Sequence, residues 1–300
     1  MSDERFLAGV RDELRAAGLR ASILVRDLDT GHEIALDADV PLPAASLTKL
    51  PIALAVLDRV EDGRLDGGQA VTVPAGNPTE GTPGTGRFRH AAVIAVDDLV
   101  SLALTISDNG AADALLELVP PADVTTDLAA LHLTGIAVRH PFRDLSDTPL
   151  ERFAPDEAHL AHTLAIRGST PAHGHPVRQL DVARTNTGTA RAWVDLLAAI
   201  WNGRGVRPAV AHRLREHLHG NVIRHRLAPD FASDASTWAS KTGTLLNLRH
   251  EIGVVEHADG SRFAVAALSA SEVAAGTQPA AEAALGAAAR ELHDRLRDPR

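Results

Sequence analysis

The chain has 300 residues, of which 45% are hydrophobic, and its formal net charge is -9 at pH 7. This length and composition can bury a large core in one compact domain, so a fibrous or disordered protein fits poorly. The charges form neither a basic stripe for nucleic acid nor a polybasic membrane patch, which favours a small-molecule or peptide partner. The chain contains no cysteine, which excludes disulfides, a thiol nucleophile and sulfur-based zinc sites but leaves the redox compartment undecided.

The first predicted element is a helix within residues 1–18, where apolar residues such as Phe6, Val10 and Leu14 recur at helical spacing among charged ones. A signal peptide would show an uninterrupted apolar run, so we expect a cytoplasmic protein as the sequence is written. Export by an unrecognised or missing signal stays open. No uncharged apolar run of 18 or more residues occurs, so no membrane-spanning helix is predicted.

The two ends of the chain carry matching patterns of strand and helix. Near the N-terminus, residues 21–28 and 33–37 flank a turn sequence and predict a hairpin. Near the C-terminus, residues 251–256 and 263–269 flank a second turn sequence, and residues 281–296 follow with an apolar helical stripe. The middle of the chain is dominated by helical patterns, at 97–106, 110–119 and 191–201, and has a Gly/Pro-rich loop at 74–86.

Terminal strands that pair with each other, with a helical segment inserted between them, would form an antiparallel sheet flanked by the terminal helices. The predicted fold class is therefore α+β in a single domain of residues 1–300. An α/β lobe would come from about residues 1–42 and 222–300, and an all-α lobe from about 43–221. The cleft between two such lobes is a favoured place for a small-molecule site.

Only two of the 30 Lys and Arg residues are lysines, Lys49 and Lys241. A guanidinium cannot release its proton in a protein, whereas an ammonium can. The two lysines therefore indicate places where an amine is chemically required, or they are chance survivors of a bias toward arginine.

The sequence Ser-Leu-Thr-Lys at 46–49 opens an apolar helix that runs through Val60. Ser46 and Lys49 are three residues apart and share a face of that helix, so the amine can reach the hydroxyl. A lysine desolvated between two lobes can have its pKa lowered enough to accept the proton when the hydroxyl attacks. Taken alone, the motif also fits Ser46 as a helix N-cap and Lys49 as a solvated side chain.

Two further motifs follow along the chain. Ser-Asp-Asn at 107–109 lies between two helical runs, so its side chains can project from a turn into the cleft, although Asp and Asn also cap helices routinely. Lys-Thr-Gly-Thr at 241–244 precedes the strand at 251–256. A strand edge with glycine lets a ligand lie against backbone N–H groups while Lys241 and Thr242 bind a carboxylate. An ordinary sheet-edge lysine is the alternative.

The probability of finding the three motifs in this order by chance is on the order of one in a hundred thousand. S-x-x-K, S-D-N and K-T-G are together the signature of class A β-lactamases and penicillin-binding proteins. The chain resembles the class A β-lactamase-like serine hydrolases, a penicillin-recognising family, at 44–49, 104–112 and 239–260. This resemblance implies the β-lactamase/transpeptidase-like fold, in which both chain ends build an α/β lobe beside an all-α lobe.

Matched by position, the resemblance implies Ser46 as the nucleophile and Lys49 as its base. Ser107 would relay a proton to the departing nitrogen, and Lys241 would orient Ser107. The backbone N–H groups of Ser46 and Thr244 would form the oxyanion hole. The implied catalytic residues are thus Ser46, Lys49, Ser107 and Lys241.

The resemblance also implies the substrate-binding residues. Asn109 would bind the substrate's amide, and Lys241 with Thr242 would hold its carboxylate. Arg249 is the candidate for a second carboxylate ligand, although the spacing from Lys241 could equally place His250 there. The implied substrate-binding residues are Asn109, Thr242, Gly243, Thr244 and Arg249.

The sequence departs from the class A pattern at the residue that activates the deacylating water. Class A enzymes carry a glutamate on a loop ahead of a threonine-rich segment, here residues 184–189, yet residues 158–214 contain no glutamate. A rough alignment places the missing residue near 172–175. His173 or His175 could serve as the base there, or both could be ordinary loop histidines.

We therefore expect a serine hydrolase that forms an acyl-enzyme with β-lactam or related amide and ester substrates. The alternatives are a penicillin-binding D-alanyl-D-alanine peptidase, a protein whose acyl-enzyme persists without turnover, and a small-ester esterase. No cofactor and no metal are expected, because the histidine pairs at 173–175 and 217–219 lack a third ligand. The expected partner is a small-molecule substrate (β-lactam, ester or D-amino-acid peptide), with no nucleic acid or membrane partner, bound by a monomer.

Overall fold

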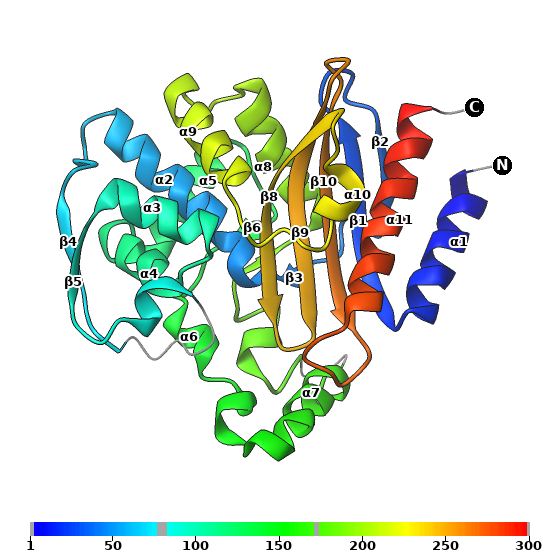
Figure 1. Ribbon diagram of the computed structural model, residues 1–300, viewed down its shortest axis with the longest axis horizontal. Coiled ribbons are helices and arrows are strands. Elements are labelled where there is room, and N and C mark those ends of the chain that lie inside the picture. Colours follow the sequence, from blue (N-terminus) through cyan, green and yellow to red (C-terminus); the bar gives the residue numbers. More distant parts are fainter. Residues whose placement is uncertain (1–2, 77–82, 171–173, 299–300) are drawn as a thin grey trace.

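The computed structural model describes residues 3–76, 83–170 and 174–298, and its main feature is a five-stranded antiparallel sheet (Figure 1). The strands are β1 (Leu19–Asp27), β2 (Glu33–Leu36), β8 (Ser236–Leu245), β9 (Leu248–His257) and β10 (Arg262–Ser271). Their order in the sheet is β2-β1-β10-β9-β8, so strands from both chain ends pair directly. This is the pairing that the sequence predicts, and it leaves β8 at an edge.

The two terminal helices, α1 (Asp3–Ala16) and α11 (Pro279–Arg297), cover one face of the sheet (Figure 1). Successive residues of a strand point to opposite faces, and β1 uses both. Ile23 and Val25 pack in the core beneath α1 and α11, whereas Leu24 packs in the larger core shared with the helical part of the molecule. Both faces of the sheet are therefore buried.

The other face is covered by helices from the middle of the chain, and α8 lies directly against β1 and β10. Of these helices, α8 (Ala190–Asn202) and α9 (Pro208–His219) pack on the sheet, and α2 (Lys49–Glu61), α3 (Val96–Thr105), α4 (Asn109–Leu118) and α5 (Pro121–Ala130) complete the helical part of the molecule beyond them. The first nine residues of α2 are all buried, as is typical of a helix surrounded by core on every side. Among the described residues, no helix has the length and apolarity needed to cross a membrane.

The chain between 138 and 186, here called the β6–β7 segment, lies at the end of the sheet (Figure 1). Three short strands, β3 (Leu42–Pro43), β7 (Thr187–Gly188) and β6 (Ile136–Ala137), anchor it as a small sheet. The segment contains α6 (Arg143–Ser146), η3 (Pro149–Arg152), η4 (Pro155–Glu157), α7 (Ala158–Arg167) and η5 (Arg178–Leu180).

The remaining elements are short. The hairpin β4 (Ala70–Val73) and β5 (Ala92–Ala95) borders α4, η1 (Ala45–Thr48) precedes α2, and α10 (Ala228–Phe231) precedes β8. The predicted loop at 74–86 lies partly outside the described residues, and its described end forms η2 (Gly84–Arg87).

Candidate active site

Ser46 lies in η1, one turn ahead of the first residue of α2, Lys49. The preceding Ala45 has a φ of 47°, in the left-handed region that residues other than glycine rarely adopt. Ser46 is partly exposed, whereas Lys49 is completely buried. Lys49 Nζ donates a hydrogen bond of 3.0 Å to Ser46 Oγ, so the hydroxyl and the amine are in direct contact.

Three further acceptors surround Lys49 Nζ, two from the turn before α4 and one from the first residue of α4. They are the Ser107 carbonyl oxygen at 2.7 Å, Ser107 Oγ at 3.1 Å and Asn109 Oδ1. Ser107 itself has a φ of 61°, and strained backbone of this kind concentrates at functional sites. Burial lowers the pKa of Lys49 well below its ordinary value, and the nearby charge of Lys241 lowers the pKa further. The neutral amine that a proton acceptor requires is thereby favoured.

Lys241 approaches the same turn from β8, the edge strand of the sheet. Its Nζ donates to Ser107 Oγ at 3.0 Å and to the Thr242 carbonyl oxygen at 2.9 Å. Burial lowers the pKa of Lys241 to about 7, with Arg226 acting in the same direction and Glu251 opposing. Ser107 Oγ therefore lies between the two lysines of the chain, as a proton relay requires.

The pKa of Lys241 predicts how acylation depends on pH. Below about pH 7 Lys241 is cationic and attracts a substrate carboxylate, and above that pH the attraction is lost with the proton. We expect the second-order acylation rate constant of a carboxylate-bearing β-lactam to fall as pH rises through about 7. An uncharged activated ester serves as the control and is expected to lack this alkaline limb. Identical pH profiles for the two reagents would show that Lys241 does not hold the carboxylate.

Asp108 holds the Ser107 turn in place. Its carboxylate caps α4 by accepting from the Ala111 N–H and also accepts from the Thr85 N–H at 2.6 Å and Thr85 Oγ1 at 2.7 Å. A Cβ on Gly84, which has a φ of +87°, would lie 2.2 Å from this carboxylate. Only glycine fits there, so η2 is fastened closely to the turn that carries Ser107 and Asn109.

The Lys-Thr-Gly-Thr stretch lies on β8, the edge strand of the sheet, next to η1. A Cβ on Gly243 would lie 3.0 Å from the Ala44 carbonyl oxygen, so the glycine permits the strand to approach the nucleophile segment. Thr242 Oγ1 donates to the Ile223 carbonyl oxygen at 3.0 Å, and Thr244 is exposed to solvent. Residues 241–244 thus lie directly beside the segment that carries Ser46.

Arg249 does not join this cluster. Its Nη1 donates to the carbonyl oxygens of Leu246 and Leu248 at 2.6 and 2.7 Å, and its Nη2 donates to that of Gly276 at 2.7 Å. Its Nε lies 3.4 Å from Glu282 Oε1. The guanidinium is occupied by these structural contacts, so the expected role of Arg249 as a carboxylate ligand needs correction.

The alternative, His250, is also occupied. Its Nε2 bonds to the Pro43 carbonyl oxygen at 2.9 Å, and its Nδ1 accepts from the Ser269 N–H at 3.1 Å. Burial lowers the pKa of His250 to about 4, so the ring is neutral at physiological pH. His250 therefore offers no positive charge to a substrate.

The cation that reaches residues 241–244 is Arg226, from the chain between α9 and α10. Its Nη2 donates to Thr244 Oγ1 at 2.8 Å, its Nη1 to the His250 carbonyl oxygen at 3.0 Å, and its Nε pairs with Glu282 at 3.2 Å. Arg226 could not be found from the sequence, because no motif sets it apart from the other arginines.

Phe142 lies on a further side of Lys49, with its ring centroid 4.4 Å from Nζ. The ring is fully buried, and its backbone is held by Asp113 of α4, which accepts from the N–H groups of Phe142 at 2.5 Å and Arg143 at 2.9 Å. Over residues 3–76, 83–170 and 174–298, no carboxylate is hydrogen-bonded to Ser46 or Lys49. An aromatic ring, rather than a general base, therefore covers this side of the amine.

The two histidines that the sequence offers as replacement bases, His173 and His175, supply no general base in the described chain. His175 is buried, its Nε2 bonds to the Ala165 carbonyl oxygen at 3.0 Å, and its Nδ1 accepts from the Val177 N–H at 3.0 Å. Both ring nitrogens are thus occupied by backbone, and His173 lies outside the described residues. No cluster of three or more potential metal ligands occurs in the part of the chain that the structure describes.

Comparison with known proteins agrees with this arrangement of fold and motifs. Residues 7–296 match the family model Beta-lactamase2, described as the β-lactamase enzyme family. The chain therefore belongs to the β-lactamase enzyme family, which confirms the family resemblance found in the sequence.

One relative is similar over the whole chain. It is the β-lactamase regulatory protein BlaB of Streptomyces cacaoi, 54% identical over 310 residues that cover 99% of each sequence. A shorter match, 26% identical over 43% of this chain and 44% of the relative, is to the β-lactamase VEB-1 of Pseudomonas aeruginosa.

Solved structures share the fold. A mutant of PBP-A, solved as an acyl-enzyme complex with penicillin G, superposes with a TM-score of 0.75 at 19% identity and covers 98% of this chain and 97% of that one. A β-lactamase from Xanthomonas campestris superposes with a TM-score of 0.75 at 22% identity over 97% and 98% of the two chains. These likenesses confirm the predicted β-lactamase/transpeptidase-like fold.

Proposed function

We propose that this chain reacts with β-lactams or related amides and esters to form an acyl-enzyme on Ser46, and that it releases the acyl group slowly. One observation carries the proposal. The buried Lys49 amine contacts Ser46 Oγ at 3.0 Å, while the ring of Phe142 lies against the same amine. The first contact favours acylation, and the second leaves no water-activating group at that place.

In the proposed acylation, Ser46 Oγ forms a bond to the substrate carbonyl carbon and gives its proton to the neutral Lys49 Nζ. Collapse of the tetrahedral intermediate breaks the carbon–nitrogen bond. Ser107 Oγ, within 3.1 Å of Lys49 Nζ and 3.0 Å of Lys241 Nζ, passes a proton to the departing nitrogen. Ser107 Oγ at the same time takes from Lys49 Nζ the proton that came from Ser46, so both side chains return to their starting protonation states. The products are a neutral amine and an ester on Ser46, and the protons balance.

Release requires a water molecule to attack that ester, and a positioned general base contributes about 10²- to 10⁴-fold to such a step. The carboxylates whose charges act on the pKa of Lys49 are Asp108 and Asp113. Both carboxylates accept hydrogen bonds from backbone N–H groups and so hold the local backbone in place. Deacylation is therefore proposed as the slow step.

Intact-protein mass spectrometry tests the acylation directly. Because a ring-opened β-lactam stays attached in full, incubation with benzylpenicillin is expected to add one whole molecule to the wild type and none to Ser46→Ala. Ser261→Ala, the same substitution in the turn between β9 and β10, is the matched control and is expected to react like the wild type. An unmodified wild type, or a modified Ser46→Ala, would remove Ser46 as the nucleophile.

A regulatory role is the second candidate function, favoured by the 54% identity to a protein named as a β-lactamase regulatory protein. Under this proposal the acylated state of Ser46 would be the signal. The test is β-lactamase activity in cells exposed to a β-lactam, with the gene either intact or carrying Ser46→Ala. A response that is lost with Ser46→Ala supports the role, and an unchanged response contradicts it.

A further inference from the structure

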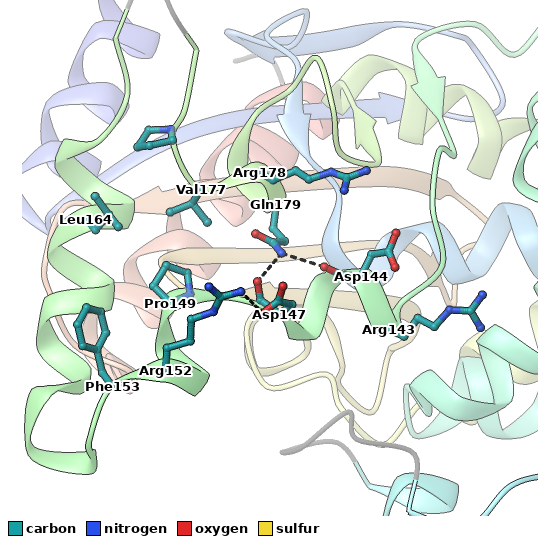
Figure 2. A pocket seen from close by; sticks show the side chains of 11 residues that line it. Arg143, Asp144, Asp147, Pro149, Arg152, Phe153, Leu164, Val177, Arg178 and Gln179 are labelled. Atoms are coloured by element: carbon teal, nitrogen blue, oxygen red, sulfur yellow. Dashed lines mark hydrogen bonds and ion pairs between the residues drawn. The ribbon is translucent and has the colours of Figure 1, made fainter.

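A cavity of about 500 Å³ lies in the β6–β7 segment, walled by α6, η3, α7 and η5 (Figure 2). None of the residues that contact Ser46 or Lys49 lines it. Nothing in the acylation proposed above uses this space. The cavity belongs to a part of the chain that the three sequence motifs leave unexplained.

The walls of the cavity are fixed by buried polar contacts. Gln179 Nε2 donates to the carbonyl oxygens of Asp144 at 2.9 Å and Asp147 at 2.8 Å, which ties η5 to the end of α6. His175 bonds through its two ring nitrogens to the backbone of Ala165 and Val177, which ties η5 to α7. The space is therefore preformed, as ligand sites usually are.

One polar atom of this wall, Gln179 Oε1, has no hydrogen-bond partner among the described residues. Gln179 is only 7% exposed, and both hydrogen bonds of its side chain are made by the amide nitrogen. Figure 2 shows the amide oxygen turned the other way, toward Val177 and Pro149. In the described chain no group donates a hydrogen bond to this oxygen, which is not sealed from solvent and can therefore accept one from a ligand.

The two ends of the cavity differ in character (Figure 2). On one side of Gln179 lie the apolar side chains of Pro149, Phe153 and Leu164. The apolar side chain of Leu164, on α7, is 38% exposed, so this end offers an apolar surface to a ligand.

On the other side lie Arg143, Arg178 and Asp144 (Figure 2). Arg143 is 3.7 Å from Glu117 in a largely exposed pair, and such pairs are weak. Arg178 is exposed and forms no ion pair with any described carboxylate. The lining residues Asp147 and Arg152 pair with each other at 2.6 Å, so Arg178 is the lining arginine that keeps a positive charge free for a ligand in the described chain.

We propose that this cavity is a second small-molecule site, which takes an anionic N-acyl amino acid or a short peptide of the same chemistry. The apolar acyl group lies against Phe153 and Leu164, the amide N–H donates to Gln179 Oε1, and the carboxylate pairs with Arg178. Each part of the ligand thus contacts a different part of the cavity wall. Arg143, which also lines the cavity, directly follows Phe142, whose ring lies against Lys49.

The probe is (4-fluorophenyl)acetylglycine, which has an aromatic group, one amide N–H and one carboxylate but no strained amide to acylate Ser46. Its ¹⁹F NMR signal reports binding to the full-length protein without any activity assay. We expect saturable binding that weakens at least about fivefold in Arg178→Ala and in Leu164→Asn. Both residues are exposed, so neither change threatens folding.

Two control variants distinguish binding at this cavity from binding near Ser46. Arg167→Ala removes the same charge from α7 without touching the cavity, and Thr244→Ala alters the edge strand beside the Ser46 segment. The proposal predicts that both bind the probe as the wild type does. Absence of saturable binding, or an affinity that falls in Thr244→Ala but not in Arg178→Ala, overturns it. The outcome does not depend on whether Ser46 is acylated.

Discussion

Replacing Lys49 by arginine is expected to lower the rate of Ser46 acylation more than about 100-fold, because a guanidinium stays protonated and cannot take the hydroxyl proton. The structure shows why the side chain at position 49 must be able to take up a proton. Lys49 is completely buried and contacts Ser46 Oγ, and its pKa is lowered by burial and by Lys241. Stopped-flow acylation by nitrocefin gives the rate, and circular dichroism shows whether the fold survives.

Lys241→Arg is the matched control, since it makes the same replacement at the other buried lysine. Arginine can still bind a carboxylate, so this variant is expected to acylate faster than Lys49→Arg. If Lys49→Arg keeps more than about a tenth of the wild-type rate, a loss of less than about 1.4 kcal/mol in activation free energy, another group must be the base.

Replacing Phe142 by glutamate is expected to accelerate hydrolysis of acyl-Ser46 at least about tenfold, toward the range that a positioned base provides. The Phe142 ring centroid is 4.4 Å from Lys49 Nζ, so a carboxylate on this side chain would lie next to the site where water must be activated. The measurement is the decay of isolated acyl-protein by mass spectrometry, which separates deacylation from any change in the acylation rate.

Phe142→Gln is the control for Phe142→Glu, because the amide has the same size and polarity but cannot accept a proton from water. A buried polar side chain at 142 is expected to cost stability in both variants. Equal decay rates in the glutamate and glutamine variants would show that the space beside Lys49 is not where a base is missing.

The motifs could be placed from the sequence because each depends on local structure. Ser46 and Lys49 share one helix turn, Ser107 lies in a turn between helices, and Lys241 lies on an edge strand, all of which hydrophobic patterning predicts. The pairing of the terminal strands followed from the same patterning and from the likeness between the chain ends.

The surroundings of the site could not be placed in this way. Arg249 is occupied by Glu282 and by the Gly276 carbonyl oxygen, groups about thirty residues away whose positions depend on how α11 packs. Phe142 reaches Lys49 from a loop without any motif, and Asp113 fixes that loop through backbone N–H groups, which leave no trace in the side-chain pattern. Tertiary packing, rather than spacing, decides these contacts.

The most direct test of slow release from Ser46 is a pre-steady-state trace of nitrocefin hydrolysis at several enzyme concentrations. We predict a burst of product close to one equivalent of enzyme, followed by a shallow steady phase, because deacylation lacks a positioned base. The burst amplitude should scale with enzyme and vanish in Ser46→Ala. Fast turnover that is linear from the first moment would contradict the account, since it would mean that a group outside the contacts described at Lys49 activates water efficiently.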